Sequence, residues 1–147
     1  MKLNVVLSGS EAECEEVNTF LGDRIYEFNA AVTGHTDGKL LAGTIRTEQG
    51  DVVAGFSGHT WGMYCELTYL WVHESYRGQN LGGQLVQAVE AEATSRGCER
   101  ILLSTHSFQA PGFYERLGYQ RLFVLEDVPH GHQKVFYSKR LRGQNGA

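Results

Sequence analysis

The sequence predicts an α/β (α+β) fold in which one mixed, mostly antiparallel sheet of about seven strands carries helices on both faces. Its 147 residues suit a single domain, which we expect over residues 1–142, with 143–147 as a frayed tail. Hydrophobic residues make up 41% and charged residues 20%, the balance of an ordinary globular protein. Apolar residues recur at strand and helix spacing in the order β α β β β α β α β β, which is the basis for the mixed sheet.

The first segments predict one strand and one long helix. Residues 3–7 (LNVVL) have the composition of an opening strand. Ser10 and Glu13 have the spacing of a capping box, which predicts a helix from about Glu11 to Ala30. Apolar residues at helical spacing follow, namely Val17, Phe20, Leu21, Ile25 and Phe28.

A hairpin and a central strand are expected next. Strands at about Leu40–Arg46 and Val52–Gly58 flank a Glu-Gln-Gly-Asp turn. Met63–Val72 is rich in Tyr, Trp, Leu and Val, so it predicts a central strand.

The second half predicts two helices and three strands. A helix begins near Leu81 and stops at Gly97. Its expected apolar face consists of Leu85, Ala88, Val89 and Ala93. Residues 100–105 (RILLST) predict a strand covered on both faces, and a short helix over about 109–117 is closed by Gly118. Strands at about 119–126 and 134–140 complete the chain.

Charge and cysteine content exclude several classes of protein. The formal net charge is −4 and the sequence pI is about 5.8, so no general attraction to nucleic acid is expected. No apolar run approaches the roughly 20 residues that a membrane span needs. Cys14, Cys65 and Cys98 are too widely spaced for a zinc site or a disulfide framework. We therefore expect a cytoplasmic protein with reduced, mostly buried thiols.

The most informative stretch is a glycine-rich junction between a strand and a helix. The strand that ends at Val72 is followed by Arg77, Gly78, Gly82 and Gly83 at the start of the next helix. Such a junction points backbone N–H groups at one spot, and the helix dipole adds positive potential there. It lacks the key residues of a P-loop or of G-x-G-x-x-G. A pyrophosphate cradle and a plain glycine-rich turn both remain open from this loop alone.

Two motifs together resemble the GNAT (GCN5-related N-acetyltransferase) superfamily over about residues 3–141. The first motif is L-x-V at 70–72 followed by R-G-Q-N-L-G at 77–82, which is similar to the family's R/Q-x-x-G-x-G/A. The second runs from Ala110 to Tyr119 and looks like A-x-x-F-Y-x-x-x-G-F/Y. Asn80 departs from the family's usual glycine, but Asn tolerates left-handed backbone better than other non-glycine residues. The departure bears on cofactor affinity rather than on the fold.

The resemblance implies an acyl-CoA N-acyltransferase fold that uses acetyl-CoA (coenzyme A) as co-substrate and no metal. In this family the strand matching 63–72 splays from its neighbour, and the pantetheine arm pairs with backbone groups there, here those of Leu70 and Val72. The residues expected to bind the cofactor are Leu70, Trp71, Val72, Arg77, Gly78, Gln79, Asn80, Leu81, Gly82, Gly83, His106, Ser107, Ala110, Phe113 and Tyr114.

The resemblance also implies two catalytic residues. Tyr114 matches a tyrosine that many members use as general acid, and a phenol and a thiol have ordinary pKa values close enough for proton transfer. Glu66 falls where histone-modifying members carry a catalytic glutamate, so it could act as base or position a water. The alternatives are that Tyr114 only packs a helix face and that Glu66 is an exposed or ion-paired strand residue.

Six histidines raise the question of a metal, but none has the spacing of a metal motif. In the family a late hairpin loop often borders the acceptor pocket, so Asp127, His130 and His132 are candidate acceptor contacts. His59, Trp61 and Tyr64 are expected to line the same pocket from the other side, or else to be core.

The leading hypothesis is direct transfer of an acetyl group to a primary amine of a small molecule or peptide, without a covalent enzyme intermediate. The alternative is a non-catalytic acyl-CoA-binding sensor or interaction module, which Asn80 alone favours. A flavodoxin-like domain is disfavoured because three predicted strands follow one another between residues 40 and 72. The late strands would allow two copies to pair, so a homodimer is a further expectation.

Overall fold

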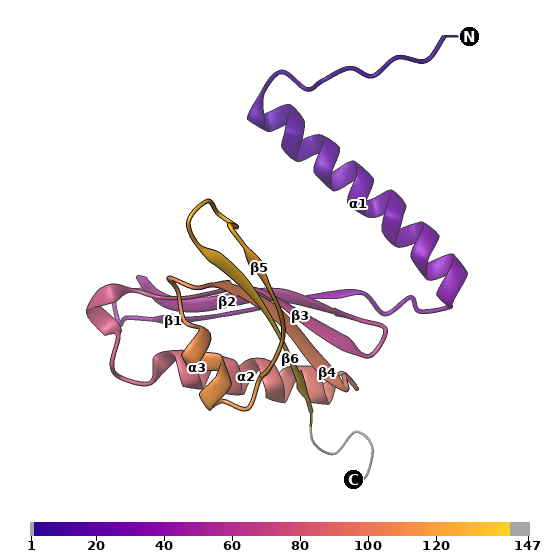
Figure 1. Ribbon diagram of the computed structural model, residues 1–147. Helices are drawn as coiled ribbons and strands as arrows, with labels where there is room; N and C mark the ends of the chain where they lie inside the picture. Colours follow the sequence, from indigo (N-terminus) through magenta and orange to yellow (C-terminus); the bar gives the residue numbers. More distant parts are fainter. Residues whose placement is uncertain (1, 142–147) are drawn as a thin grey trace. The chain divides into compact units, whose positions relative to one another are not determined.

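A computed structural model of the chain describes residues 2–141, and the chain divides between Thr36 and Asp37 into two compact units. The first unit contains α1 (Glu11–Thr33) (Figure 1). The N–H of Glu13 donates to Ser10 Oγ at 3.2 Å, which confirms the predicted cap. The helix runs three residues beyond the predicted Ala30 and ends at Gly34, whose φ of 79° is left-handed. Whether residues 1–142 form a single domain stays a prediction, and 143–147 lie outside the described residues.

The predicted strand at residues 3–7 is wrong. Residues 2–9 form no strand, and the apolar side chains there are exposed, from 85% for Leu3 to 92% for Val5. A strand is held by ladder hydrogen bonds to a neighbour, and the only regular element in the first unit is a helix, which offers no such bonds. The described sheet therefore has six strands rather than about seven.

The second unit is built on that sheet, whose order is β1-β2-β3-β4-β6-β5. Its strands are β1 (Lys39–Arg46), β2 (Val52–Trp61), β3 (Tyr64–Val72), β4 (Arg100–His106), β5 (Gln120–Glu126) and β6 (Gln133–Arg140). Every neighbouring pair is antiparallel except β3 and β4, which are parallel, so the mixed, mostly antiparallel sheet is confirmed. The turn between β2 and β3 consists of Gly62 and Met63, both with positive φ, so Met63 does not belong to the strand as predicted.

Two helices of this unit, α2 (Leu81–Ser95) and α3 (Pro111–Arg116), lie on the same side of the sheet (Figure 1). A short 3₁₀ turn, η1 (Glu74–Tyr76), precedes α2. The buried residues of α2 are Leu85, Val86, Val89 and Ala93. Val86 takes the place that the sequence pattern assigned to Ala88, which is exposed. Gly97 follows the helix with a φ of 84°, the predicted stop.

The core lies between these helices and the sheet. It contains Cys65 and Cys98, two of three free cysteines, whereas Cys14 is exposed. Burial raises the pKa of the Cys65 thiol to about 12, so this thiol is unreactive at neutral pH.

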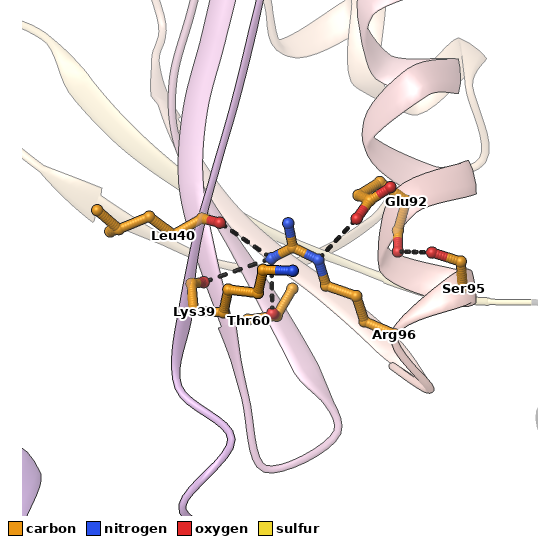
Figure 2. A network of polar contacts seen from close by, with 6 residues as sticks. All are labelled: Lys39, Leu40, Thr60, Glu92, Ser95 and Arg96. Carbon is orange, nitrogen blue, oxygen red and sulfur yellow. Dashed lines mark hydrogen bonds and ion pairs between the residues drawn. The ribbon is translucent and has the colours of Figure 1, made fainter.

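Arg96 ties the end of α2 to the first two strands (Figure 2). Its Nε donates to Glu92 Oε2 at 2.8 Å, and its Nη1 donates to Thr60 Oγ1 at 3.0 Å and to the Leu40 carbonyl at 3.1 Å. The Arg96 side chain is 16% exposed and Thr60 is buried. One guanidinium therefore supplies donors to a helix and two strands, which fixes α2 against the sheet.

We expect Arg96→Met to lower the free energy of unfolding by about 2 kcal/mol, because a buried hydroxyl and a strand carbonyl lose their donor. Urea denaturation would measure the loss. Arg24→Met is the matched control, since Arg24 forms an ion pair with Glu27 in which both side chains are largely exposed, and we expect little change. Equal losses in the two variants would contradict the role given to Arg96.

Candidate active site

The central feature of the site is a split between β3 and β4. The two strands pair only from Tyr64 to Glu66, opposite residues 100–102, although each continues well beyond. A bulge explains the parting, because Ser57 pairs with Tyr69 while Gly58 pairs with Leu67, so one residue of β3 is extra. Bulges bend the strand that carries them and increase its twist. Beyond the bulge, β3 follows β2 and β4 follows β6.

Gly58 makes this bulge feasible. A Cβ at this position would collide with the carbonyl oxygen of Glu66 and would lie 3.1 Å from the Leu67 Cα. The backbones of β2 and β3 approach so closely here that only glycine fits.

The glycine-rich loop leads from β3 into the N-terminus of α2. Arg77 Nε donates to the Val72 carbonyl at 3.1 Å, which fixes the loop to the end of β3. Gly78 and Asn80 have positive φ values of 82° and 61°. Asn80 thus adopts the left-handed backbone that the sequence predicted for it. The loop forms without glycine at this position.

The backbone N–H groups of residues 78–83 donate no hydrogen bond to any described residue. The first intrahelical bond is made by Gln84, whose N–H donates to the Asn80 carbonyl at 3.1 Å. Glycine lets two side chains pack against this end, since a Cβ at Gly82 would lie 3.2 Å from the Phe113 ring and one at Gly83 would meet the Asn80 side chain. Free donors at the start of a 15-residue helix, together with its dipole, favour an anion.

A cleft of about 650 Å³ lies where this helix end meets the split. Eleven of the residues expected to bind the cofactor line it: Leu70, Trp71, Val72, Arg77, Gly78, Asn80, Leu81, Gly82, Gly83, Ala110 and Phe113. Gln79, His106, Ser107 and Tyr114 were expected in the same group and do not line it. Tyr76, Phe108, Gln109 and Arg116 line it and were missed. The only signal for these four was proximity to the two motifs.

A second, larger cavity of about 830 Å³ lies between α2, α3 and β6. Two of its charged groups are paired with each other, because Lys139 Nζ contacts Glu90 at 3.1 Å and donates to the Leu117 carbonyl at 2.8 Å, whereas Arg116 and Arg140 also line the cavity. Tyr119 also donates to Glu90, at 3.0 Å. The cavity is lined by the later part of α2 and the last residue of α3, so neither helix presents its N-terminus to it, and we place the site in the smaller cleft.

The residues after β4 are held by contacts of their own. Ser107 exchanges hydrogen bonds with Gln133 at the start of β6, its N–H donating at 2.8 Å and its Oγ accepting at 3.0 Å. The His106 ring stacks on Phe108 with centroids 5.2 Å apart, and Phe108 contacts His132 edge-on at 4.9 Å. Phe108 therefore links the cleft to the β5–β6 loop.

Tyr114 lies in the core, 7% exposed, with its ring against Phe113, Tyr119 and Tyr137. Its hydroxyl makes no hydrogen bond to a described residue, yet no fully buried polar side-chain atom among them lacks a partner. The hydroxyl tip therefore reaches accessible space. Burial raises the pKa of Tyr114 to about 12, which keeps the phenol protonated throughout the neutral range.

Glu66 occupies the last paired position before the split, opposite residue 102 on β4 and opposite His59 on β2. Its side chain is exposed. Its charge acts on a neighbour, because burial first and Glu66 second raise the pKa of Tyr64. A carboxylate thus stands at the apex of the split, by which we mean the point where β3 and β4 separate.

The residues expected to contact the acceptor fall into two separate groups. His59 and Trp61 surround Tyr64, with ring centroids 6.2 Å and 6.1 Å away, near the β2–β3 turn. From Tyr64 to Trp71 at the cleft is about 23 Å along an extended strand. The structure therefore does not bring this group to the cleft lining.

The second group lies in the β5–β6 loop. The Asp127 carboxylate accepts from the Gly131 N–H at 2.7 Å and contacts His130 Nδ1 at 3.1 Å. The His130 side chain is 97% exposed. His132 contacts Phe108, which lines the cleft, so this loop is the one beside the cleft.

No group of three or more His, Cys, Asp or Glu suited to a metal ion occurs among residues 2–141. Within the same range no helix is long and apolar enough to cross a membrane.

Comparison with known proteins shows similarity to one family. The model of the acetyltransferase (GNAT) family matches residues 10–119. The chain is 32% identical to an acetyltransferase of Agrobacterium fabrum over 140 residues, which cover 95% of this chain and all of that protein. It is 38% identical to the blasticidin-S acetyltransferase of Streptomyces morookaense over 95 residues, 64% of this chain and 70% of the relative. A crystal structure of an acetyltransferase from Bacillus cereus superimposes with a TM-score of 0.76 at 31% identity, covering 94% and 98% of the two chains.

We expect Gly58→Ala to destabilise the protein by at least about 2 kcal/mol, because the new Cβ meets backbone rather than a movable side chain. Thermal or urea unfolding would measure this. Gly55→Ala, on the same strand, is the matched control, since its Cβ would lie 3.0 Å from the nearest atom, and we expect a smaller loss. If both variants lose the same stability, close approach at the bulge is not the constraint.

Proposed function

The chain belongs to the acetyltransferase (GNAT) family, and we propose that it transfers an acetyl group from acetyl-CoA directly to a primary amine of a small molecule or peptide. The observation that carries this proposal is the set of unpaired backbone donors at residues 78–83, which stand beside the split between β3 and β4. An acyl-CoA needs both features, a site for its diphosphate and a slot for its extended arm.

The diphosphate fits the start of α2. Backbone N–H groups and the helix dipole attract the anion without a side chain, and the cations Arg77 and Arg116 line the same cleft. Gly78 has open space where a Cβ would stand, which leaves room for a phosphate oxygen close to the backbone there. When bound, the coenzyme supplies the acetyl thioester.

The split fits the pantetheine arm. Past Glu66 the edge of β3 that faces β4 has no strand partner, so its backbone groups are available to a ligand, apart from the Val72 carbonyl, which accepts from Arg77. We propose that the backbone at Leu70 and Val72 pairs with the arm. An N–H there can also polarise the thioester carbonyl. Stabilisation of this kind typically lowers the activation free energy by about 3 kcal/mol.

Proton transfer is assigned to Glu66 and Tyr114. Glu66 is exposed at the apex of the split, where a carboxylate can take a proton from the attacking amine, directly or through water. Tyr114 remains protonated and can donate to the departing sulfur. Its raised pKa makes it a weaker acid than the thiol, so its main contribution is a hydrogen bond to the leaving group.

The acceptor is proposed to be a cationic small molecule or peptide amine. The Asp127 carboxylate lies in the loop that Phe108 and His132 connect to the cleft, and His59 stands opposite Glu66. Both regions remain proposed acceptor contacts. The β5–β6 loop adds His130, and the β2–β3 region adds Trp61 and Tyr64. One relative is named for acetylating blasticidin S, which supports a small molecule.

Two further proposals concern the cellular context. The free, buried thiols of Cys65 and Cys98 suit a reducing compartment, and we propose the cytoplasm. Strand β5 is an edge of the sheet, so two copies could form a homodimer through it. The alternative of a non-catalytic sensor loses its one favourable feature, because Asn80 adopts the backbone that the loop needs.

We expect the protein to release free thiol from acetyl-CoA when supplied with a panel of primary amines. Gly82→Glu should raise the Kd for CoA at least about 100-fold, because its carboxylate would stand among the phosphate donors. Thiol release and calorimetry would measure the two effects. Gly82→Ala adds only the Cβ and should keep more affinity than Gly82→Glu at similar thermal stability. Unchanged CoA affinity in Gly82→Glu would show that the phosphate site is misplaced.

We expect Tyr114→Phe to lower kcat by about 100-fold with little change in KM for acetyl-CoA, because the hydroxyl acts on the leaving group. Since the pKa of Tyr114 is about 12, the loss should be the same factor from pH 7 to pH 9. Steady-state kinetics across that range would test it. A variant with unaltered kcat would reduce Tyr114 to a packing residue.

A further inference from the structure

The side-chain oxygen of Gln109 is surrounded by donors from the end of β4. Gln109 Oε1 accepts from the His106 N–H at 2.7 Å and from Thr105 Oγ1 at 3.2 Å. The His106 ring nitrogen Nδ1 lies 3.2 Å from the same oxygen. The Gln109 backbone N–H in turn donates to the His106 carbonyl at 2.9 Å. Gln109 is therefore fixed at both its backbone and its side chain.

These contacts determine which way the amide faces. A backbone N–H can only donate, so the atom opposite the His106 N–H must be the amide oxygen. The Gln109 nitrogen Nε2 consequently points the other way. It donates to none of the residues in the range 2–141, although Gln109 lines the cleft. A residue of the cleft lining therefore has an oriented amide donor that no described residue uses.

Gln109 also closes the split. Successive N–H groups of a strand point to opposite edges, and the Ser107 N–H faces β6 because it donates to Gln133. The His106 N–H must then face the edge from which β3 has departed. Gln109 Oε1 takes the place of the missing strand there, at the last residue of β4. The amide thus lies at the boundary between the split and the phosphate-binding end of the cleft.

We propose that Gln109 is a co-substrate-binding residue whose Nε2 donates a hydrogen bond to an oxygen of the acyl-CoA. The acceptor oxygen belongs either to an amide carbonyl of the pantetheine arm or to the diphosphate. This inference rests on the proposed function of the cleft. It gives the amide two roles, an acceptor for the protein and a donor for the ligand.

Two variants separate these roles. Gln109→Glu keeps an oxygen for His106 and Thr105 but has no donor at pH 7, and it adds a charge. Gln109→Met has neither donor nor acceptor and is uncharged. If the donor matters, both variants should raise the Kd for CoA about tenfold, the usual effect of one lost hydrogen bond. KM for acetyl-CoA should rise with them while kcat is retained.

The other outcomes overturn the inference. Loss of affinity in Gln109→Glu alone would reveal only charge repulsion, and loss in Gln109→Met alone would reveal only support of the loop. Wild-type affinity in both would also overturn it. Gln120→Glu, an exposed position on β5, controls for net charge and should bind CoA as the wild type does.

Calorimetry with ADP identifies the acceptor oxygen. ADP carries the diphosphate without the arm, so weakened ADP binding in both variants assigns the contact to the diphosphate. Unchanged ADP binding with weakened CoA binding assigns it to the arm. Failure of the wild type to bind CoA would overturn the proposed function and this inference with it, whereas failure of the variants to differ overturns this inference alone.

Discussion

The parting of β3 from β4 is the constraint on which the rest of the site depends. A parallel pair that continued to the ends of both strands would satisfy all their backbone groups and leave no slot for a ligand. The extra residue of β3 and the close approach at Gly58 stop the ladder at Glu66. The released edges then need other partners, and the protein supplies one of them itself through Gln109.

Local signals in the sequence were sufficient for much of the fold. The Ser10 cap, the stop at Gly97 and the left-handed Asn80 depend on a few adjacent residues, and each was predicted. The strand at 3–7 was predicted wrongly because a strand depends on a partner that local composition does not encode. The position of the bulge also could not be read locally, because it is a relation between two strands.

In the candidate site, too, features set by adjacent residues could be predicted, whereas features set by distant partners could not. Two motifs located the glycine-rich loop and Phe113, both of which line the cleft, since backbone geometry at glycines follows from the residues themselves. Arg116 and Gln109 carry no such pattern, and their place in the lining depends on how the segment after β4 folds back toward the start of α2, where Phe113 lies against Gly82. Net charge was also uninformative about this site. An acidic chain can hold a polyanion when the donors are backbone amides, which do not appear in a count of charged residues.

The proposed function assigns binding and chemistry to different positions along one strand, and the geometry gives a reason for this separation. The phosphate donors lie past the end of β3, whereas Glu66 stands at the apex of the split, four residues before Leu70 and about 13 Å from it along the strand. A carboxylate at the phosphate end would repel the coenzyme and would gain a proton more easily beside that anion. In the proposed mechanism the two charges are separated by the length of the split, so that Glu66 is available as a base while neutral amides hold the diphosphate. The extended arm would then bring the thioester to the carboxylate.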